Sequence, residues 1–131
     1  MIEALMNAGQ RLAEALRAEN AALARLDLGA AAELSRGKRL AADAFAAAFD
    51  ATHRSGSRAE GEERDRTEEI ARALKDLTAE NRRLLERAIA LQSRVIETIA
   101  GALRPPGPGT YGHRGLAREG EATPVSIASR A

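Results

Sequence analysis

The feature that most constrains the fold is an unbroken helical repeat in the second half of the chain. From residue 70 to residue 95, the positions of one stripe recur at alternating intervals of four and three residues. This spacing places the side chains along one face of an α-helix and is typical of helices that pack on other helices. The stripe consists of Ile70, Leu74, Leu77, Asn81, Leu84, Ala88, Leu91 and Val95.

A second apolar stripe runs beside the first. Two adjacent stripes make a face wider than a single partner helix covers, so we expect this helix to contact two others. Thr67 can cap its start, and the Pro- and Gly-rich segment at 104–109 ends it. The sequence therefore predicts a helix over residues 67–103. The second stripe is formed by Leu85, Ile89, Ile96, Ile99 and Leu103.

The first half of the chain predicts two more helices. Leucines at three- and four-residue spacing indicate a helix over residues 2–27, although Gly9 and Glu19 fall within the same stripe. The Asp-Leu-Gly sequence at 27–29 favours a local break, because glycine weakens a helix interior by about 1 kcal/mol relative to alanine. The alternative is a continuous helix with a shift in heptad phase. Beyond this point, a stripe of shifted phase predicts a helix over residues 30–50.

The remaining segments have little to bury. Residues 51–66 contain no Leu, Ile, Val or Phe, so we expect a connector there. Together the segments predict an all-α fold, either an elongated antiparallel helical hairpin or a three-helix, coiled-coil-like bundle, over residues 1–103. Residues 104–131 carry only isolated hydrophobic side chains, which do not offset the entropy of ordering. We expect this segment to be a flexible, disordered tail.

Composition argues against several classes of protein. Lys and Arg number 20 against 19 Asp and Glu, and they are spread evenly, so the basic footprint of a nucleic-acid-binding protein is missing. The absence of cysteine excludes disulfides, thiolate metal sites and thiol catalysis. The longest apolar run, Ala44–Phe49, is far shorter than the roughly 20 residues of a membrane span. Residues 1–10 lack the apolar core of a signal peptide. We expect a soluble protein without direct membrane insertion.

The candidate residues for chemistry are few and scattered. His53 and His113 have no companion ligand at metal-binding spacing. The acidic pairs at 62–63 and 68–69 are charge runs typical of exposed helix faces. No glycine-rich loop follows a strand pattern, as phosphate binding requires. We therefore expect no enzyme activity, no cofactor and no metal.

Residues 74–115 resemble the FlgN family of flagellar export chaperones. The similar pattern begins with two leucines and an asparagine, continues through a Leu-Leu-Glu triplet and a long helix, and ends with a proline-containing break and a Tyr-Gly element. Further upstream, Glu19, Asp27 and Lys38 follow the family outline more loosely, whereas Arg82 and Arg83 replace residues that are often smaller or aromatic. The residues that carry the resemblance are Leu74, Leu77, Asn81, Leu84, Leu85, Glu86, Tyr111, Gly112 and Gly115.

The resemblance implies a cytoplasmic chaperone of the flagellar type III export system. Such a chaperone binds hook–filament junction proteins, also called hook-associated proteins, before their export and escorts them to the export gate at the membrane. In the family the C-terminal part binds the client, and the tyrosine-glycine element, matched here by Tyr111 and Gly112, docks at the gate. The implied client-binding residues are Leu84, Ala88, Leu91, Val95, Ile99, Leu103, Val125 and Ile127.

A second interpretation is a structural or regulatory coiled-coil protein that self-associates through the same stripe. The isolated Tyr111 favours the chaperone, because a structural coiled coil has no need of it. The sequence is compatible with both a monomer and a homodimer. Asn81 also has two interpretations, a polar residue that fixes helix register, which we favour, and a contact for a bound partner.

Overall fold

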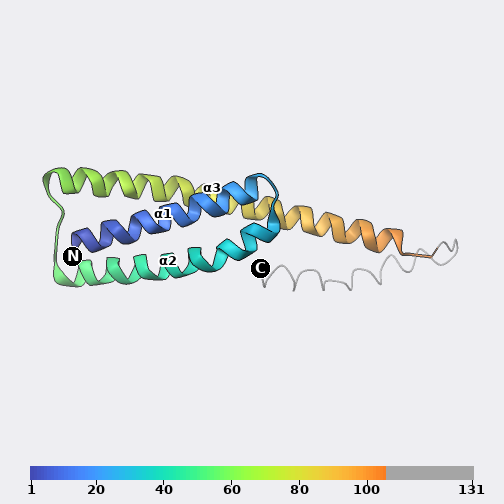
Figure 1. Ribbon diagram of the computed structural model, residues 1–131, viewed down its shortest axis with the longest axis horizontal. Coiled ribbons are helices and arrows are strands. Elements are labelled where there is room, and N and C mark those ends of the chain that lie inside the picture. The colour runs from blue at the N-terminus through green and yellow to red at the C-terminus, as the bar shows by residue number, and fades with distance from the viewer. Residues whose placement is uncertain (106–131) are drawn as a thin grey trace. The chain divides into compact units, whose positions relative to one another are not determined.

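The computed structural model describes residues 1–105 and confirms an all-α fold (Figure 1). No strand occurs in this part of the chain. Residues 1–88 form one compact unit, and a second begins at Ile89, within the last helix. The predicted tail lies outside the described residues except for Arg104 and Pro105. Helix α1 spans Ile2–Ala24, helix α2 spans Leu28–Ser55 and helix α3 spans Gly61–Ala102.

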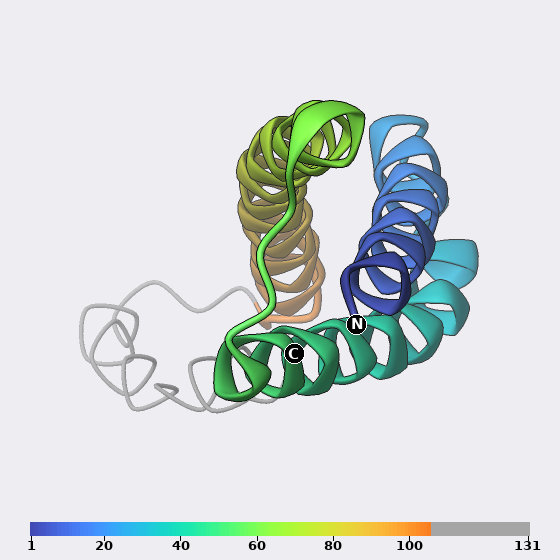
Figure 2. The ribbon, with the colours of Figure 1, turned by 90° about the vertical axis from the view of Figure 1, so that its left-hand side faces the viewer.

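Within the first unit, α1 and α2 form an antiparallel hairpin, and α3 packs on this hairpin. The backbones of α1 and α2 approach each other most closely. Seen end-on, α1 and α3 lie side by side while α2 crosses beneath them (Figure 2). The buried apolar side chains form two small clusters rather than one broad core. One cluster contains Ala13, Leu16 and Leu74, and the other contains Ala22, Leu23, Ala31, Leu84 and Ala88.

A tight turn separates α1 from α2, and α1 ends three residues before the predicted limit of 27. Leu26 has a left-handed φ of 60°. Its N–H donates to the Leu23 carbonyl at 3.0 Å, and the Asp27 N–H donates to the Ala22 carbonyl at 2.9 Å. These two bonds form a Schellman motif, which satisfies the last carbonyls of a helix. Asp27 then caps α2 by accepting a hydrogen bond from the Ala30 N–H at 3.1 Å.

The connector between α2 and α3 comprises residues 56–60 and is shorter than the predicted segment 51–66. Both helices continue into the sequence that lacks large apolar residues, because local interactions support them there. Arg64 pairs with Glu68 one turn later at 3.1 Å. Thr67, the predicted cap, lies inside α3, where its hydroxyl donates to the Glu63 carbonyl at 2.7 Å. Gly56 ends α2 with a φ of 70°.

At Gly9, side chains of both α2 and α3 pack close to the backbone of α1. A Cβ atom at this position would lie 2.8 Å from Ile70 Cγ2 and 3.4 Å from Phe45 Cε1. The Ile70 methyl group sits on a stiff, β-branched side chain that cannot swing aside. The glycine in the apolar stripe is therefore a packing requirement.

We expect Gly9→Ala to destabilise the protein. The gain of about 1 kcal/mol in helix propensity is outweighed by an overpacking cost of about 1–3 kcal/mol, so the net loss should be on the order of 1 kcal/mol. Gly37→Ala is the matched control, because no atom lies within 4 Å of its Cβ position and the same propensity gain applies. Urea unfolding of both variants measures the difference. Equal stabilisation by both substitutions contradicts this account of Gly9.

Candidate functional site

All three helices meet at a cluster of hydrogen-bonded polar side chains, formed by Glu19 and Asn20 of α1, Lys38 of α2 and Asn81 of α3. Lys38 Nζ donates to Glu19 Oε1 at 2.9 Å and to Asn81 Oδ1 at 3.3 Å. Asn81 Nδ2 donates to Glu19 Oε1 at 2.6 Å and to Asn20 Oδ1 at 2.8 Å. Asn20 Nδ2 donates to the Leu77 carbonyl at 3.2 Å. This polar cluster joins residues that are up to 62 positions apart in the chain.

The polar cluster is an internal feature of the first unit. Glu19 is 0% exposed, Asn81 is 6% exposed, and the Lys38 side chain is the most accessible member at 19%. It lies between the two apolar clusters, since Glu19 falls between Leu16 and Leu23 on α1. Glu19 Oε2 has no hydrogen-bond partner within the described residues. Because its members are largely buried and bonded to one another across three helices, the polar cluster contributes to packing and register.

Sequence reasoning singled out three members of the polar cluster without predicting that they touch, and it missed Asn20. Glu19 and Asn81 each interrupt an apolar stripe, and Lys38 belongs to the loose part of the resemblance. Two polar interruptions on helices that must pack together are a signal for a buried pair. The structure places Asn81 in contact with these internal groups.

Replacing Lys38, the positively charged member of the polar cluster, should destabilise the fold strongly. Lys38→Met leaves the buried Glu19 carboxylate without its positive partner, and loss of one member of a buried ion pair costs about 3–5 kcal/mol. We expect a value near the lower end, because Lys38 is partly exposed. Adding Glu19→Gln to Lys38→Met should recover part of the loss, since no uncompensated charge remains. A double-mutant cycle by urea unfolding measures the coupling energy between Lys38 and Glu19. If the free-energy losses of the two single substitutions simply add in the double variant, the two side chains are not coupled and the prediction is wrong.

The structure divides the predicted client-binding residues into two groups. Leu84 and Ala88 are 3% and 7% exposed and pack in the cluster with Ala22, Leu23 and Ala31. In this conformation the hairpin already covers both side chains. Tyr111, Gly112, Val125 and Ile127 lie outside the described residues.

The other predicted residues belong to the second unit and form an apolar face there. Leu91 is half-buried, whereas Val95, Ile99 and Leu103 are 56%, 54% and 78% exposed. Ile96, which the sequence assigns to the second stripe, is 45% exposed and lies on the same side of the helix. We call these five residues, Leu91, Val95, Ile96, Ile99 and Leu103, the apolar face.

Polar groups are distributed asymmetrically around this part of α3. At about 100° per residue, Glu97 projects from the side opposite the apolar face, whereas Arg94 flanks the face next to Leu91. Gln92 is the only polar side chain within the arc that the apolar face spans among residues 89–102. This surface therefore offers contact area without charges, acids or bases.

The first unit also contains a small apolar cavity where α2 ends. The cavity has a volume of about 110 Å³ and is lined by both phenylalanines of the chain together with Leu5, Met6 and Ile70. His53 stacks on the outer phenylalanine, Phe49, with ring centroids 6.4 Å apart. The cavity lining contains no titratable side chain that could act on a substrate.

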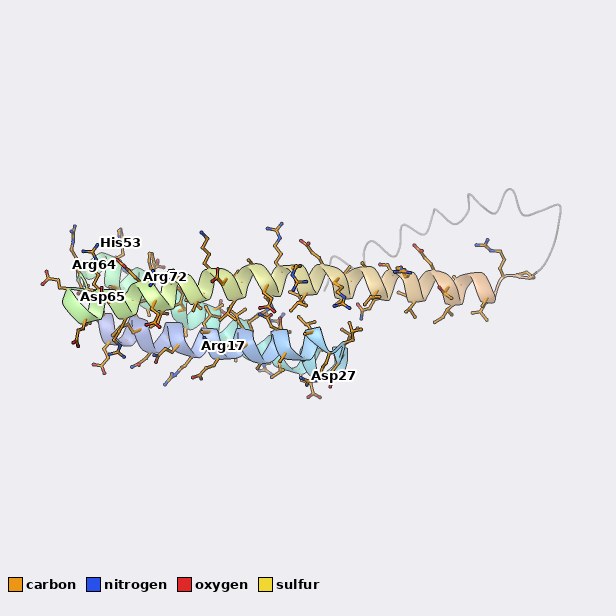
Figure 3. The ribbon with its side chains drawn as sticks, turned by 90° about the horizontal axis from the view of Figure 1, so that it is seen from above. Arg17, Asp27, His53, Arg64, Asp65 and Arg72 are labelled. Atoms are coloured by element: carbon orange, nitrogen blue, oxygen red, sulfur yellow. The ribbon has the colours of Figure 1, made fainter. Side chains whose placement is uncertain are left out.

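The labelled polar residues of the first unit are spread along its length. His53, Arg64 and Asp65 lie at one end of this unit and Asp27 at the other (Figure 3).

Residues 1–105 contain no group of three or more His, Asp or Glu side chains arranged to hold a metal ion. Within the same range, none of the helices combines the length and the apolar character needed to cross a membrane. Comparisons with protein-family models, curated proteins and solved structures found no match to this chain.

Proposed function

We propose that this protein is a FlgN-type export chaperone that binds a helix of a client protein through the apolar face of α3. The single observation behind the proposal is the change in burial along the apolar side of α3. Leu84 and Ala88 are covered within the first unit, whereas the first stripe is exposed at Val95 and the second stripe beside it is exposed at Ile99 and Leu103. A stripe that continues beyond its internal partners leaves a surface for an external helix.

The energetics favour an amphipathic helix as the occupant. Burial of apolar surface contributes roughly 25 cal/mol per Å², and aligned side chains at intervals of four residues suit a helix laid along them. Large exposed apolar residues that cluster are uncommon on monomeric proteins and mark interaction sites. Binding of this kind is reversible and needs neither nucleotide nor metal.

Hook–filament junction proteins are the proposed clients, by the resemblance of residues 74–115 to the FlgN family. Their helical termini assemble with one another, so covering an apolar helix face in the cytoplasm prevents premature assembly. In this proposal Leu91, Val95, Ile99 and Leu103 contact the client, while Leu84 and Ala88 support the helix from inside the bundle. Val125 and Ile127 stay candidates for additional contacts.

Delivery to the membrane export gate is assigned to Tyr111 and Gly112 on the basis of the resemblance alone. The alternative function, a structural or regulatory coiled-coil protein that self-associates, uses the same apolar face. The two functions differ in whether a junction protein forms a stoichiometric complex with the chain.

Co-expression with the junction proteins of the host tests the proposal directly. We expect the full chain to hold a junction protein in a soluble, stoichiometric complex. Val95→Glu should weaken that complex roughly a hundredfold or more, because it places a charge in an apolar contact. Ala90→Glu is the matched control on the opposite side of the helix and should leave binding unchanged. The proposal is wrong if no complex forms with any junction protein, or if the two variants behave alike.

Tyr111→Ala separates client binding from delivery. We expect the variant to bind the junction protein as the unmodified chain does, with a binding constant within about twofold. Export of the client by intact cells should fall strongly, measured as the amount of junction protein reaching the medium. A loss of client binding instead assigns Tyr111 to the client site.

A further inference from the structure

The small apolar cavity beside the C-terminal end of α2 has no part in the proposed function. We propose that this cavity is a binding site for one apolar group, an aromatic ring or a branched alkyl chain, at the end of a larger molecule. All of its lining residues belong to the first unit, whereas the proposed client site belongs to the second. The inference therefore stands independently of the chaperone function.

The lining of the cavity is apolar at every position but one. Thr67 is the exception, and its hydroxyl already donates a hydrogen bond to the Glu63 carbonyl at 2.7 Å. The lining side chains therefore offer a ligand no free hydrogen-bond donor. A polar group that entered the cavity would lose its hydrogen bonds to water without replacement, which is unfavourable, whereas an apolar group gains by leaving water.

The aromatic residues of the chain are concentrated at this cavity. The sequence contains two phenylalanines and one tyrosine, and both phenylalanines, Phe45 and Phe49, belong to the lining. Met6 adds a polarizable thioether, which makes favourable contacts with aromatic rings. Sites for small ligands are lined mainly by apolar and aromatic side chains. The lining thus has the composition of a ligand site for an apolar ring.

The volume of the cavity limits the size of the group that enters it. The cavity measures about 110 Å³. An engineered cavity of about 150 Å³, lined by Leu, Ile and Phe, stays dry and binds benzene or xenon. Sites for whole drug-sized ligands measure roughly 300–1,000 Å³. The cavity therefore suits a single ring or branched chain, and the rest of a larger ligand has to stay outside.

The two sides of the lining differ in their exposure to solvent. Met6 and Leu74 are buried, whereas Ala71 is exposed and Phe49 is 54% exposed. The cavity therefore opens between Phe49 of α2 and Ala71 of α3. An apolar group enters through this opening while the molecule that carries it stays in solvent. Its arrival also covers part of the exposed Phe49 side chain.

NMR of the methyl groups of the full chain, titrated with two probes, tests the inference. Toluene supplies a ring alone, and N-acetyl-phenylalanine amide supplies the same ring attached to a peptide backbone. We expect both probes to cause saturable shifts of the Met6, Ile70 and Leu74 methyl signals. The dissociation constant for toluene should be on the order of 1 mM, which is within reach of apolar ligands of this size. The methyl signals of Leu84 should not move, because Leu84 lies in a separate cluster.

Ala71→Leu fills the cavity and provides the decisive variant. The larger side chain should raise the dissociation constant of both probes at least tenfold, and the exposure of position 71 lets the variant fold. Ala79→Leu is the matched control, since it makes the same change at an exposed position of α3 outside the lining, and it should alter binding by less than twofold. Circular dichroism checks that both variants keep the helical content of the unmodified chain.

Three results overturn the inference. The first is the absence of saturable shifts with toluene. The second is equal binding by the Ala71→Leu and Ala79→Leu variants, which places the probe elsewhere on the chain. The third is binding of toluene without binding of N-acetyl-phenylalanine amide, because the cavity then admits a free hydrocarbon but not a group carried by a larger molecule.

Discussion

The attachment of α3 to the hairpin depends on the buried polar cluster around Glu19. Two small apolar clusters lie on either side of it, and each would tolerate some sliding of one helix along another. The polar cluster does not, because displacement of Asn81 by one turn separates it from Glu19 and Lys38 and costs the buried groups their hydrogen bonds to its amide. The register fixed here determines which part of the α3 stripe the hairpin covers. Leu84 is covered, and the stripe is exposed at Val95.

Helix number and type could be predicted from the sequence, because the spacing of apolar residues persists over many turns. The helix ends could not, since they depend on local hydrogen bonds. Leu26 takes a left-handed conformation that usually favours glycine, so the sequence indicates a break at 27–29 but not the earlier end of α1 at Ala24. The observed connector is shorter than the predicted one because a sequence without large apolar residues is also compatible with a solvent-exposed helix. Arg64 and Glu68 instead support a solvent-exposed helical turn.

The candidate site was partly predictable for a related reason. Periodicity identifies the stripe, but it does not tell where the partner helices end, so Leu84 and Val95 look equivalent in sequence. Burial distinguishes them, at 3% and 56% exposed. The polar cluster escaped sequence reasoning because its members come from three helices. Only the tertiary arrangement brings Lys38 next to the other two stripe interruptions, Glu19 and Asn81.

Hydrogen exchange of the full chain, with and without a bound junction protein, tests most directly whether the exposed part of the stripe is the contact surface. The free chain is measured at a concentration where it is monomeric. The account predicts that client binding slows exchange of backbone amides in residues 91–102 and leaves those of residues 9–23 unchanged, because the latter already lie in the packed unit. Slowed exchange confined to the outer surfaces of residues 1–88, with no change in 91–102, contradicts it.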